Sequence, residues 1–177
     1  KIEIIVVDDG SIDRTIEIVR KYKKVKLLRQ EHKGPGEARN LGAKNAKGKI
    51  LILVDADMTF DRNYIKNLIE PIINDNTGKI IGTTHSIEIV RNIENIWSKC
   101  WRQIKVTEED IKNPKIFRAI KKKNFLEMKG FDRKYGYADD QTFLFKYYIK
   151  PELVKAICYH KNPGTLKVLY NTNLFKP

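Results

Sequence analysis

The chain has 177 residues, a formal net charge of +13 and an apolar fraction of 41%. This length is typical of one domain with a buried core, the composition excludes a disordered chain, and no apolar run approaches the ~18 residues of a membrane span. The positive charge favours polyanionic partners, namely nucleic acid, phosphorylated ligands or an anionic membrane face.

Strand and helix patterns alternate through the first half of the chain. The β-branched run over residues 2–9 predicts a strand that ends in Asp8 and Asp9, and Ser11 is a suitable N-cap for the next helix. The elements expected after this helix are a strand over 25–30, a helix within 34–48, a strand over 49–57, a helix over 61–74 and a strand over 79–86. This order predicts a doubly wound, mostly parallel α/β sheet, in which ligands bind at the carboxyl ends of strands.

The second half of the chain has less regular patterns. We expect a helix over 92–106, a strand and short helix within 116–132, a helix over 139–150, a strand over 154–163 and a closing helix over 164–175. No repeat or linker interrupts the sequence, so residues 1–177 are interpreted as one domain. Cys100 and Cys158 flank no ligand pattern and are expected to be reduced cytosolic thiols.

Two carboxylates end the apolar strand predicted over residues 49–57. Because side chains alternate along a strand, Asp55 and Asp57 should point to the same side, about 7 Å apart. Two acids this close repel each other, and a bound cation would relieve that repulsion. Hard oxygen ligands at a sheet edge suit Mg²⁺ or Mn²⁺, partly coordinated by substrate phosphates. The alternative interpretation is a solvated strand end without a metal.

One enzyme signature fits the same stretch. The sequence "DADMT" at residues 55–59 resembles the Asp-x-Asp-x-Thr motif of haloacid-dehalogenase-like phosphatases. In that interpretation Asp55 is a nucleophile, and Asp139 and Asp140 hold Mg²⁺. However, the motif normally ends the first strand of its domain, and at least two strands are predicted before it here.

The order of motifs resembles family 2 glycosyltransferases with the GT-A fold more closely. "VVDDGSIDRT", "GPGEARNLGAKNAKGKILILVDADM" and "KKKNFLEMKGFDRKYGYADDQTF" follow one another from about Ile2 toward His160. Members of that family begin with a strand and a nucleotide-contacting loop before the "DDGS" strand. That first strand has no counterpart here, so we expect one wall of the nucleotide pocket to be missing from this stretch of sequence.

The resemblance implies a role for each matching residue. Asp8 or Asp9 would accept a hydrogen bond from the base of a nucleoside diphosphate sugar, and Arg39 would approach the base or the phosphates. Gly34 and Gly36 would allow the backbone to pass closely. The remaining roles are nucleotide-sugar binding by Asp55 and Asp139, metal binding by Asp57 and His160, and general-base catalysis by Asp140.

The implied reaction is an inverting, metal-dependent sugar transfer from a UDP- or GDP-sugar to a glycan hydroxyl or lipid phosphate, with Mn²⁺ or Mg²⁺ as cofactor. Residues 1–90 would bind the nucleotide sugar and residues 91–177 the acceptor. No "QxxRW"-like motif follows Asp140, which favours single transfer over polymerisation. We expect action in the cytoplasm or at the cytoplasmic face of a membrane, with Lys121, Lys122 and Lys123 as candidate membrane contacts. A nucleic-acid partner is not expected, because acids clustered at strand ends would repel phosphates.

Overall fold

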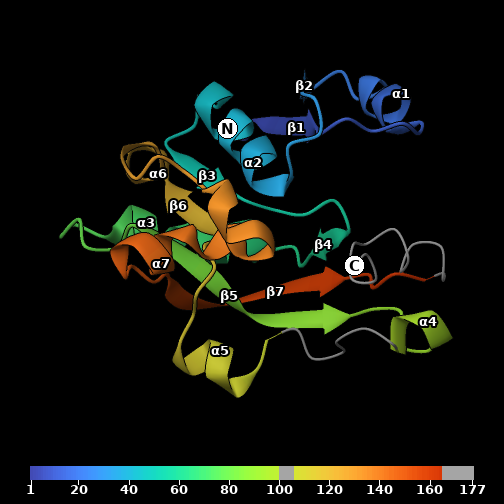
Figure 1. Ribbon diagram of the computed structural model, residues 1–177. Coiled ribbons are helices and arrows are strands. Elements are labelled where there is room, and N and C mark those ends of the chain that lie inside the picture. Colours follow the sequence, from blue (N-terminus) through green and yellow to red (C-terminus); the bar gives the residue numbers. More distant parts are fainter. Residues whose placement is uncertain (100–105, 165–177) are drawn as a thin grey trace.

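The computed structural model describes residues 1–99 and 106–164, and its strands form two sheets. The smaller sheet pairs β1 (Ile4–Asp8) with β2 (Val25–Arg29) in parallel. The larger sheet has the order β3-β6-β5-β7-β4. Its strands are β3 (Ile50–Ile52), β4 (Met58–Phe60), β5 (Gly82–Val90), β6 (Ala119–Lys121) and β7 (Glu152–His160). Figure 1 shows β5 and β7 as long neighbouring strands, with the β1–β2 pair above them.

Helices connect and cover these strands. They are α1 (Thr15–Arg20), α2 (Pro35–Asn45), α3 (Tyr64–Asn74), α4 (Ile96–Lys99), α5 (Glu108–Lys112), α6 (Lys122–Glu127), the 3₁₀ segment η1 (Arg133–Gln141) and α7 (Thr142–Tyr147). Helix α2 packs against β1 on one side and against α6 and η1 on the other, so it joins the two parts of the fold.

The side-chain alternation of the strands separates two buried clusters on the two faces of the larger sheet. Ile120 of β6 packs with a group of phenylalanines, in which Phe125 and Phe131 meet edge to face with ring centroids 5.3 Å apart. Its neighbour Ala119 packs instead with the apolar face of α3, around Leu68. This alternation produces a layered α/β core, with α3 on one face and α2, α6 and α7 toward the other.

The predicted order of strands and helices in the first half is confirmed, but the prediction of a mostly parallel sheet is wrong for the larger sheet. Among the described strands of that sheet, β5 and β7 are parallel, whereas β3–β6, β5–β6 and β4–β7 are antiparallel. The strand expected over 49–57 ends at Ile52, and the chain then turns and returns as β4. This reversal places β4 antiparallel to β7.

Several predicted boundaries also change. Ser11 does not cap a helix: its backbone N–H donates to Asp8, and α1 begins only at Thr15. Asp139 and Asp140 belong to η1, so the helix expected over 139–150 begins at Thr142. Within the described part of the predicted 92–106 helix, α4 covers only Ile96–Lys99, and the predicted closing helix lies outside the described residues.

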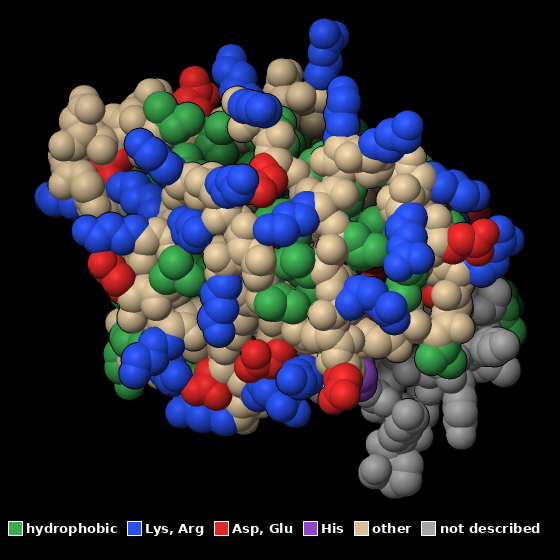
Figure 2. Space-filling view, turned by 90° about the horizontal axis from the view of Figure 1, so that it is seen from above, with side chains coloured by type: hydrophobic (Ala, Val, Ile, Leu, Met, Phe, Trp, Pro, Cys, Tyr) green, Lys and Arg blue, Asp and Glu red, His purple; other side chains and the backbone are tan. Residues whose placement is uncertain are grey.

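The surface is rich in basic side chains. On the face shown in Figure 2, Lys and Arg side chains are spread widely, and acidic side chains are scattered among them. No helix in the described ranges is both long and apolar enough to cross a bilayer. Cys158 is a free, buried thiol, and Cys100 lies outside the described residues.

Candidate active site

Asp8 and Asp9, at the end of β1, are both engaged by neighbouring groups. Asp8 is 2% exposed, accepts from the backbone N–H of Ser11 at 3.2 Å and faces Arg29 at 3.4 Å. Hydrogen bonds from Ser11 lower the pKa of Asp8 against the effect of burial. The Asp9 carboxylate accepts from the Gln30 side chain at 2.7 Å and from the backbone N–H groups of residues 33 and 34, at 2.8 and 2.9 Å. Asp9 therefore ties the loop before α2 to the end of β1.

Asp55 forms an ion-pair cluster with Arg39 of α2 and with Arg118, which precedes β6. Arg39 Nη2 lies 2.6 Å from Asp55 Oδ1, and Arg118 Nη1 lies 3.0 Å from Asp55 Oδ2, so each oxygen of Asp55 has its own guanidinium. Burial raises the pKa of Asp55, but the charges and hydrogen bonds of Arg118 and Arg39 lower it by more, so the pKa of Asp55 lies below its ordinary value. The carboxylate therefore stays ionised at neutral pH.

Asp139 joins this cluster from η1. Its Oδ1 lies 3.6 Å from Arg39 Nη1, and the residue is 5% exposed. Its carboxylate sits against the first turn of α2, where a Cβ atom on Gly36 would lie 2.2 Å from Asp139 Oδ2. The absence of a side chain at Gly36 thus leaves room for the Asp139 carboxylate, a contact that differs from the predicted close passage of backbone. Gly34 serves differently: nothing crowds it, but its φ of 95° is one that residues other than glycine rarely adopt.

Asp140 is partly buried beside the same charges. Among the described residues its carboxylate has no hydrogen-bond or ion-pair partner. Burial raises the pKa of Asp140, and Asp139 and Asp55 add to this while Arg39 opposes it. A carboxylate with a raised pKa and no fixed partner can accept a proton more readily than an ordinary surface acid.

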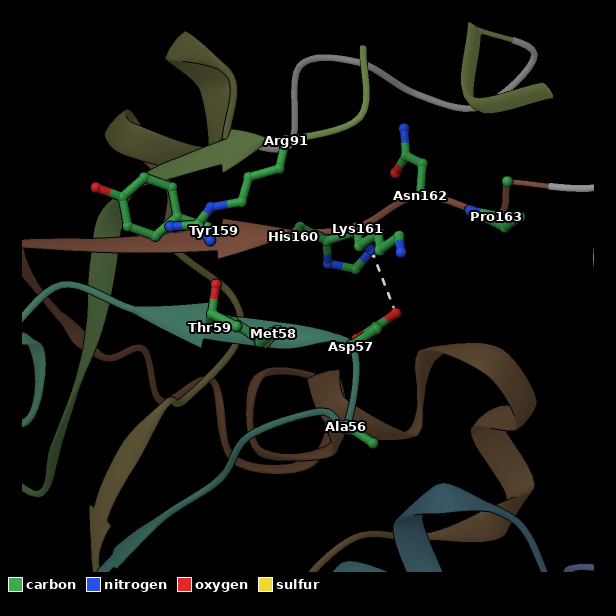
Figure 3. A pocket seen from close by; sticks show the side chains of 11 residues that line it. Ala56, Asp57, Met58, Thr59, Arg91, Tyr159, His160, Lys161, Asn162 and Pro163 are labelled. Atoms are coloured by element: carbon green, nitrogen blue, oxygen red, sulfur yellow. Dashed lines mark ion pairs between the residues drawn. The ribbon is translucent and has the colours of Figure 1, made fainter. Parts of the chain in front are cut away.

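Asp57 and His160 meet where β4 and β7 pair. His160 Nε2 lies 3.4 Å from Asp57 Oδ2, and the Asp57 side chain is 51% exposed. Figure 3 shows the two side chains pointing toward one another from adjacent segments. They line a cavity of about 530 Å³, together with Arg91, Tyr159 and Lys161 among others. The structure therefore brings together the two residues predicted to hold a metal.

Asp55 and Asp57 do not lie side by side on one strand, as the alternation argument required. The strand has already ended at Ile52, and the backbone N–H of Met58 donates to the Asp55 carbonyl in a turn. Asp55 consequently pairs with arginines, while Asp57 enters β4 and faces β7. The continuous strand on which the same-side prediction was based is therefore absent at these two residues.

A buried chain of polar residues continues inward from His160. His160 Nδ1 lies 3.2 Å from Glu88 Oε1, and Glu88 Oε2 lies 3.1 Å from His85 Nε2. His85 Nδ1 lies 2.9 Å from the Tyr64 hydroxyl. Burial raises the pKa of Glu88, but the two histidines lower it more, so Glu88 is ionised.

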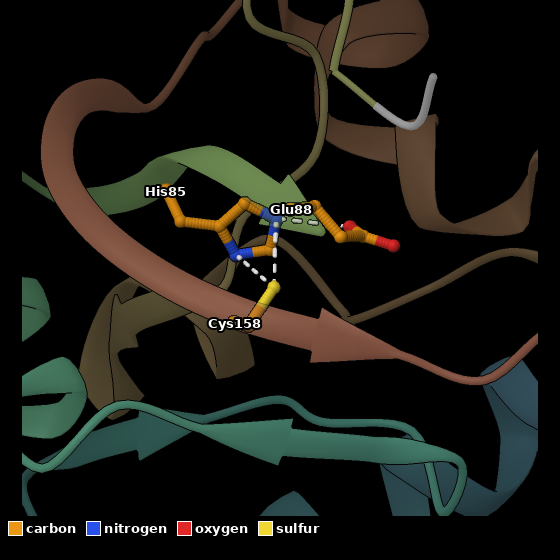
Figure 4. Close-up of side chains that lie close together, drawn as sticks. All are labelled: His85, Glu88 and Cys158. Atoms are coloured by element: carbon orange, nitrogen blue, oxygen red, sulfur yellow. Dashed lines mark hydrogen bonds and ion pairs between the residues drawn. The ribbon is translucent and has the colours of Figure 1, made fainter. Parts of the chain in front are cut away.

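His85, Glu88 and Cys158 lie close enough to be considered as a metal group (Figure 4). However, the Cys158 sulfur is 3.6 Å from both nitrogens of His85, so it faces the ring instead of a lone pair in the ring plane. Burial raises the pKa of this thiol to about 12, which keeps it protonated. Thiolate is the form that binds metals, so this trio is better described as a hydrogen-bonded core network.

Sequence reasoning missed Arg118, Glu88 and His85. Arg118 stands alone within the apolar run "IFRAI", and a charge inside a buried strand segment requires a partner. That signal could have identified it as a counterion. Glu88 and His85 lie three residues apart in β5, and a bulge between His85 and Ile87 brings their side chains together. No sequence pattern indicates that irregularity.

Comparisons with known proteins agree with this geometry. The family model "Glycosyl transferase family 2" matches residues 1–132. The poly(ribitol-phosphate) beta-N-acetylglucosaminyltransferase TarS of Staphylococcus aureus is 39% identical over 70 residues, which is 37% of this chain and 12% of that protein. The glycosyltransferase GlyG of Streptococcus pneumoniae is 35% identical over 92 residues, 49% of this chain and 31% of that protein.

The solved structure of S. aureus TarS residues 1–349 has the same fold, with a TM-score of 0.63 at 20% identity, covering 90% of this chain and 51% of that one. Its complex with UDP gives a TM-score of 0.64. This likeness confirms the predicted GT-A architecture. The chain spans about half of the solved TarS structure and less than a third of the two curated relatives.

Proposed function

The chain belongs to glycosyltransferase family 2, and we propose that it transfers a sugar from a nucleoside diphosphate sugar to an acceptor with inversion at the anomeric carbon. The observation that carries this proposal is the meeting of Asp57 and His160 at the rim of a cavity. The phosphatase alternative is not supported, because the family match is to another class and both oxygens of Asp55 are held by arginines.

The donor atoms at this rim fit a divalent cation. Asp57 offers a half-exposed carboxylate, and the opposing His160 has its other nitrogen anchored on Glu88, an arrangement common around metal-bound histidines. In the proposal Asp57 and His160 hold Mn²⁺ or Mg²⁺. The cation, when bound, would offset the negative charge that develops on the diphosphate leaving group.

Asp140 is the proposed general base. It takes the proton of the acceptor hydroxyl, the oxygen forms a bond to the anomeric carbon, and the bond from that carbon to the diphosphate breaks. Its upward pKa shift and lack of a fixed partner in the described structure support this role. Arg39, Asp55 and Asp139 would shape the donor side of the site, because their ion pairs hold η1 against α2.

Residues 1–90 would bind a UDP- or GDP-sugar through Asp8 or Asp9. Residues 91–177 would bind a glycan hydroxyl or lipid-phosphate acceptor, and they would also contribute Asp140 and His160 to the site. The basic surface supports action in the cytoplasm or at a cytoplasmic membrane face, since it would attract anionic lipids. No nucleic-acid partner is proposed.

Calorimetry with UDP and GDP, with and without Mn²⁺, tests the donor and metal assignments on the full-length protein. Asp57→Ala should abolish the Mn²⁺-dependent part of nucleotide binding, and Asp140→Asn should leave binding intact but lower turnover by about 10²–10⁴-fold. Unchanged Mn²⁺-dependent affinity in Asp57→Ala would refute the metal assignment. Wild-type turnover by Asp140→Asn would refute the base assignment.

A further inference from the structure

When both histidine rings are neutral, the contacts of the buried chain from Tyr64 to His160 fit one arrangement of protons. Glu88 is an ionised acceptor for two histidines, so His85 donates to it through Nε2–H and His160 donates through Nδ1–H. His85 Nδ1 then carries a lone pair and accepts from the Tyr64 hydroxyl at 2.9 Å. Burial raises the pKa of Tyr64, so its hydroxyl keeps its proton and can donate.

This assignment has a consequence at the other end of the chain. If Nδ1 of His160 carries the proton, the neutral ring presents a lone pair at Nε2, and this lone pair faces the Asp57 carboxylate at 3.4 Å. Two acceptors facing each other repel unless a cation or a proton lies between them. The internal network therefore prepares this end of His160 for a positively charged partner.

We propose that Glu88 is a positioning residue, which fixes the ring orientation and tautomer of His160 so that Nε2 is open to a divalent cation shared with Asp57. Glu88 suits this role because its side chain is only 9% exposed and each of its two oxygens contacts a different histidine. The His85 side chain is 4% exposed and holds Glu88 in place through the contact of its Nε2 with Glu88 Oε2. This inference rests on the proposed metal role of Asp57 and His160.

The decisive variant is Glu88→Gln. The amide is nearly the same size, but it has one acceptor oxygen and one donor nitrogen, so at most one histidine can keep its N–H···O contact. In metal-free protein at about pH 8, ¹⁵N NMR of the histidine rings should show His160 protonated at Nδ1 in the wild type. The variant should show a mixture of tautomers, or the opposite tautomer at His85. Wild-type ring signals for both histidines in Glu88→Gln would overturn the inference.

Metal affinity provides a second, independent measurement. Mn²⁺ titrations in the presence of UDP, followed by calorimetry and electron paramagnetic resonance, should show a 10- to 100-fold weaker site in Glu88→Gln. Glu152→Gln is the matched control, because it makes the same charge change at an exposed position of β7 and should bind Mn²⁺ as the wild type does. Equal affinity in Glu88→Gln and the control would contradict the role of Glu88.

Two further variants keep the test decisive. Tyr64→Phe removes only the hydroxyl that donates to His85 Nδ1, so it should move the ¹⁵N signal of this nitrogen and weaken Mn²⁺ binding by a smaller factor. It replaces Glu88→Gln if that variant does not fold, and unchanged His85 signals would overturn the inference. His160→Ala separates the two proposals: Mn²⁺-dependent UDP binding that survives in this variant would overturn the inference and leave the proposed sugar transfer standing. Absence of that binding in the wild type would refute both.

Discussion

Asp55 and Asp57 are two residues apart, yet the structure predicts that their substitution has different effects on stability. Asp55 is the ion-pair partner of Arg118, whose side chain is only 15% exposed, and it also pairs with Arg39. Asp55→Asn removes the carboxylate that pairs with Arg118, and it leaves Arg39 with only its longer contact to Asp139. Asp57 has a half-exposed side chain and a single histidine partner. Asp57→Asn should therefore cost little free energy of unfolding.

The magnitude follows from burial. Removing one partner of a fully buried ion pair costs about 3–5 kcal/mol. The Asp55 side chain is 35% exposed, so solvent screens part of the interaction, and we expect a loss of about 2 kcal/mol. In a domain of this size that loss lowers Tm by about 4–8 °C. Asp57→Asn, as an exposed substitution, should stay within about 0.5 kcal/mol of the wild type.

The assay is urea unfolding and a thermal scan of both variants beside the wild type. The pH dependence gives an internal check, because the pKa of Asp55 is lowered in the folded state. Its contribution is fully present above the unfolded value of about 3.9 and is lost as the pH falls through the folded value. The Tm gap between wild type and Asp55→Asn should thus narrow below about pH 4. Equal Tm losses for Asp55→Asn and Asp57→Asn would refute this reasoning.

Three other variants test separate parts of the molecule. Gly36→Ala should displace the Asp139 carboxylate and lower turnover at least 10-fold with little change in far-UV circular dichroism; wild-type turnover would contradict the close contact. Asp9→Asn should make the loop before α2 exchange its amide hydrogens faster, and unchanged hydrogen exchange would mean that Asp9 does not hold it. Lys49→Glu with Lys123→Glu should weaken binding to anionic vesicles in a salt-dependent manner, and equal binding to neutral vesicles would refute a membrane role.

The three consecutive lysines Lys121, Lys122 and Lys123 are predicted membrane contacts, but they differ in their contacts within the structure. Lys121 pairs with Asp75, whose side chain is 3% exposed, at 3.2 Å, and Lys122 donates to the carbonyl of Ala46 near the end of α2. Lys123 is exposed and pairs loosely with Glu127 at 3.9 Å. Two of the three lysines therefore stabilise the fold, and the membrane prediction now depends on Lys123 and on neighbouring lysines around the same hollow, such as Lys49.

The family motifs indicated which side chains lie together, whereas the strand boundaries around them were predicted less well. The resemblance assigned Arg39, Asp139 and Asp55 to one nucleotide-sugar site, and in the structure Arg39 contacts both carboxylates. Their roles toward the nucleotide sugar stay predictions. Periodicity could not show that the third strand ends at Ile52, since the apolar run continues through Leu53 and Val54 without a break in pattern. The bulge in β5 that joins His85 to Glu88 is likewise set by pairing with β7, which a local pattern does not encode.

The turn between Asp55 and Asp57 explains why a pair of acids ends an apolar strand. If both acids continued along the strand, they would share one environment, and each would raise the pKa of the other. The turn instead sends Asp55 toward two arginines and Asp57 toward a histidine and a cavity. The first acid is compensated by the protein itself, whereas the second keeps an exposed oxygen for a ligand. Because only one residue separates them, a single turn can direct Asp55 to the ion pairs that stabilise the fold and Asp57 to the rim of the cavity.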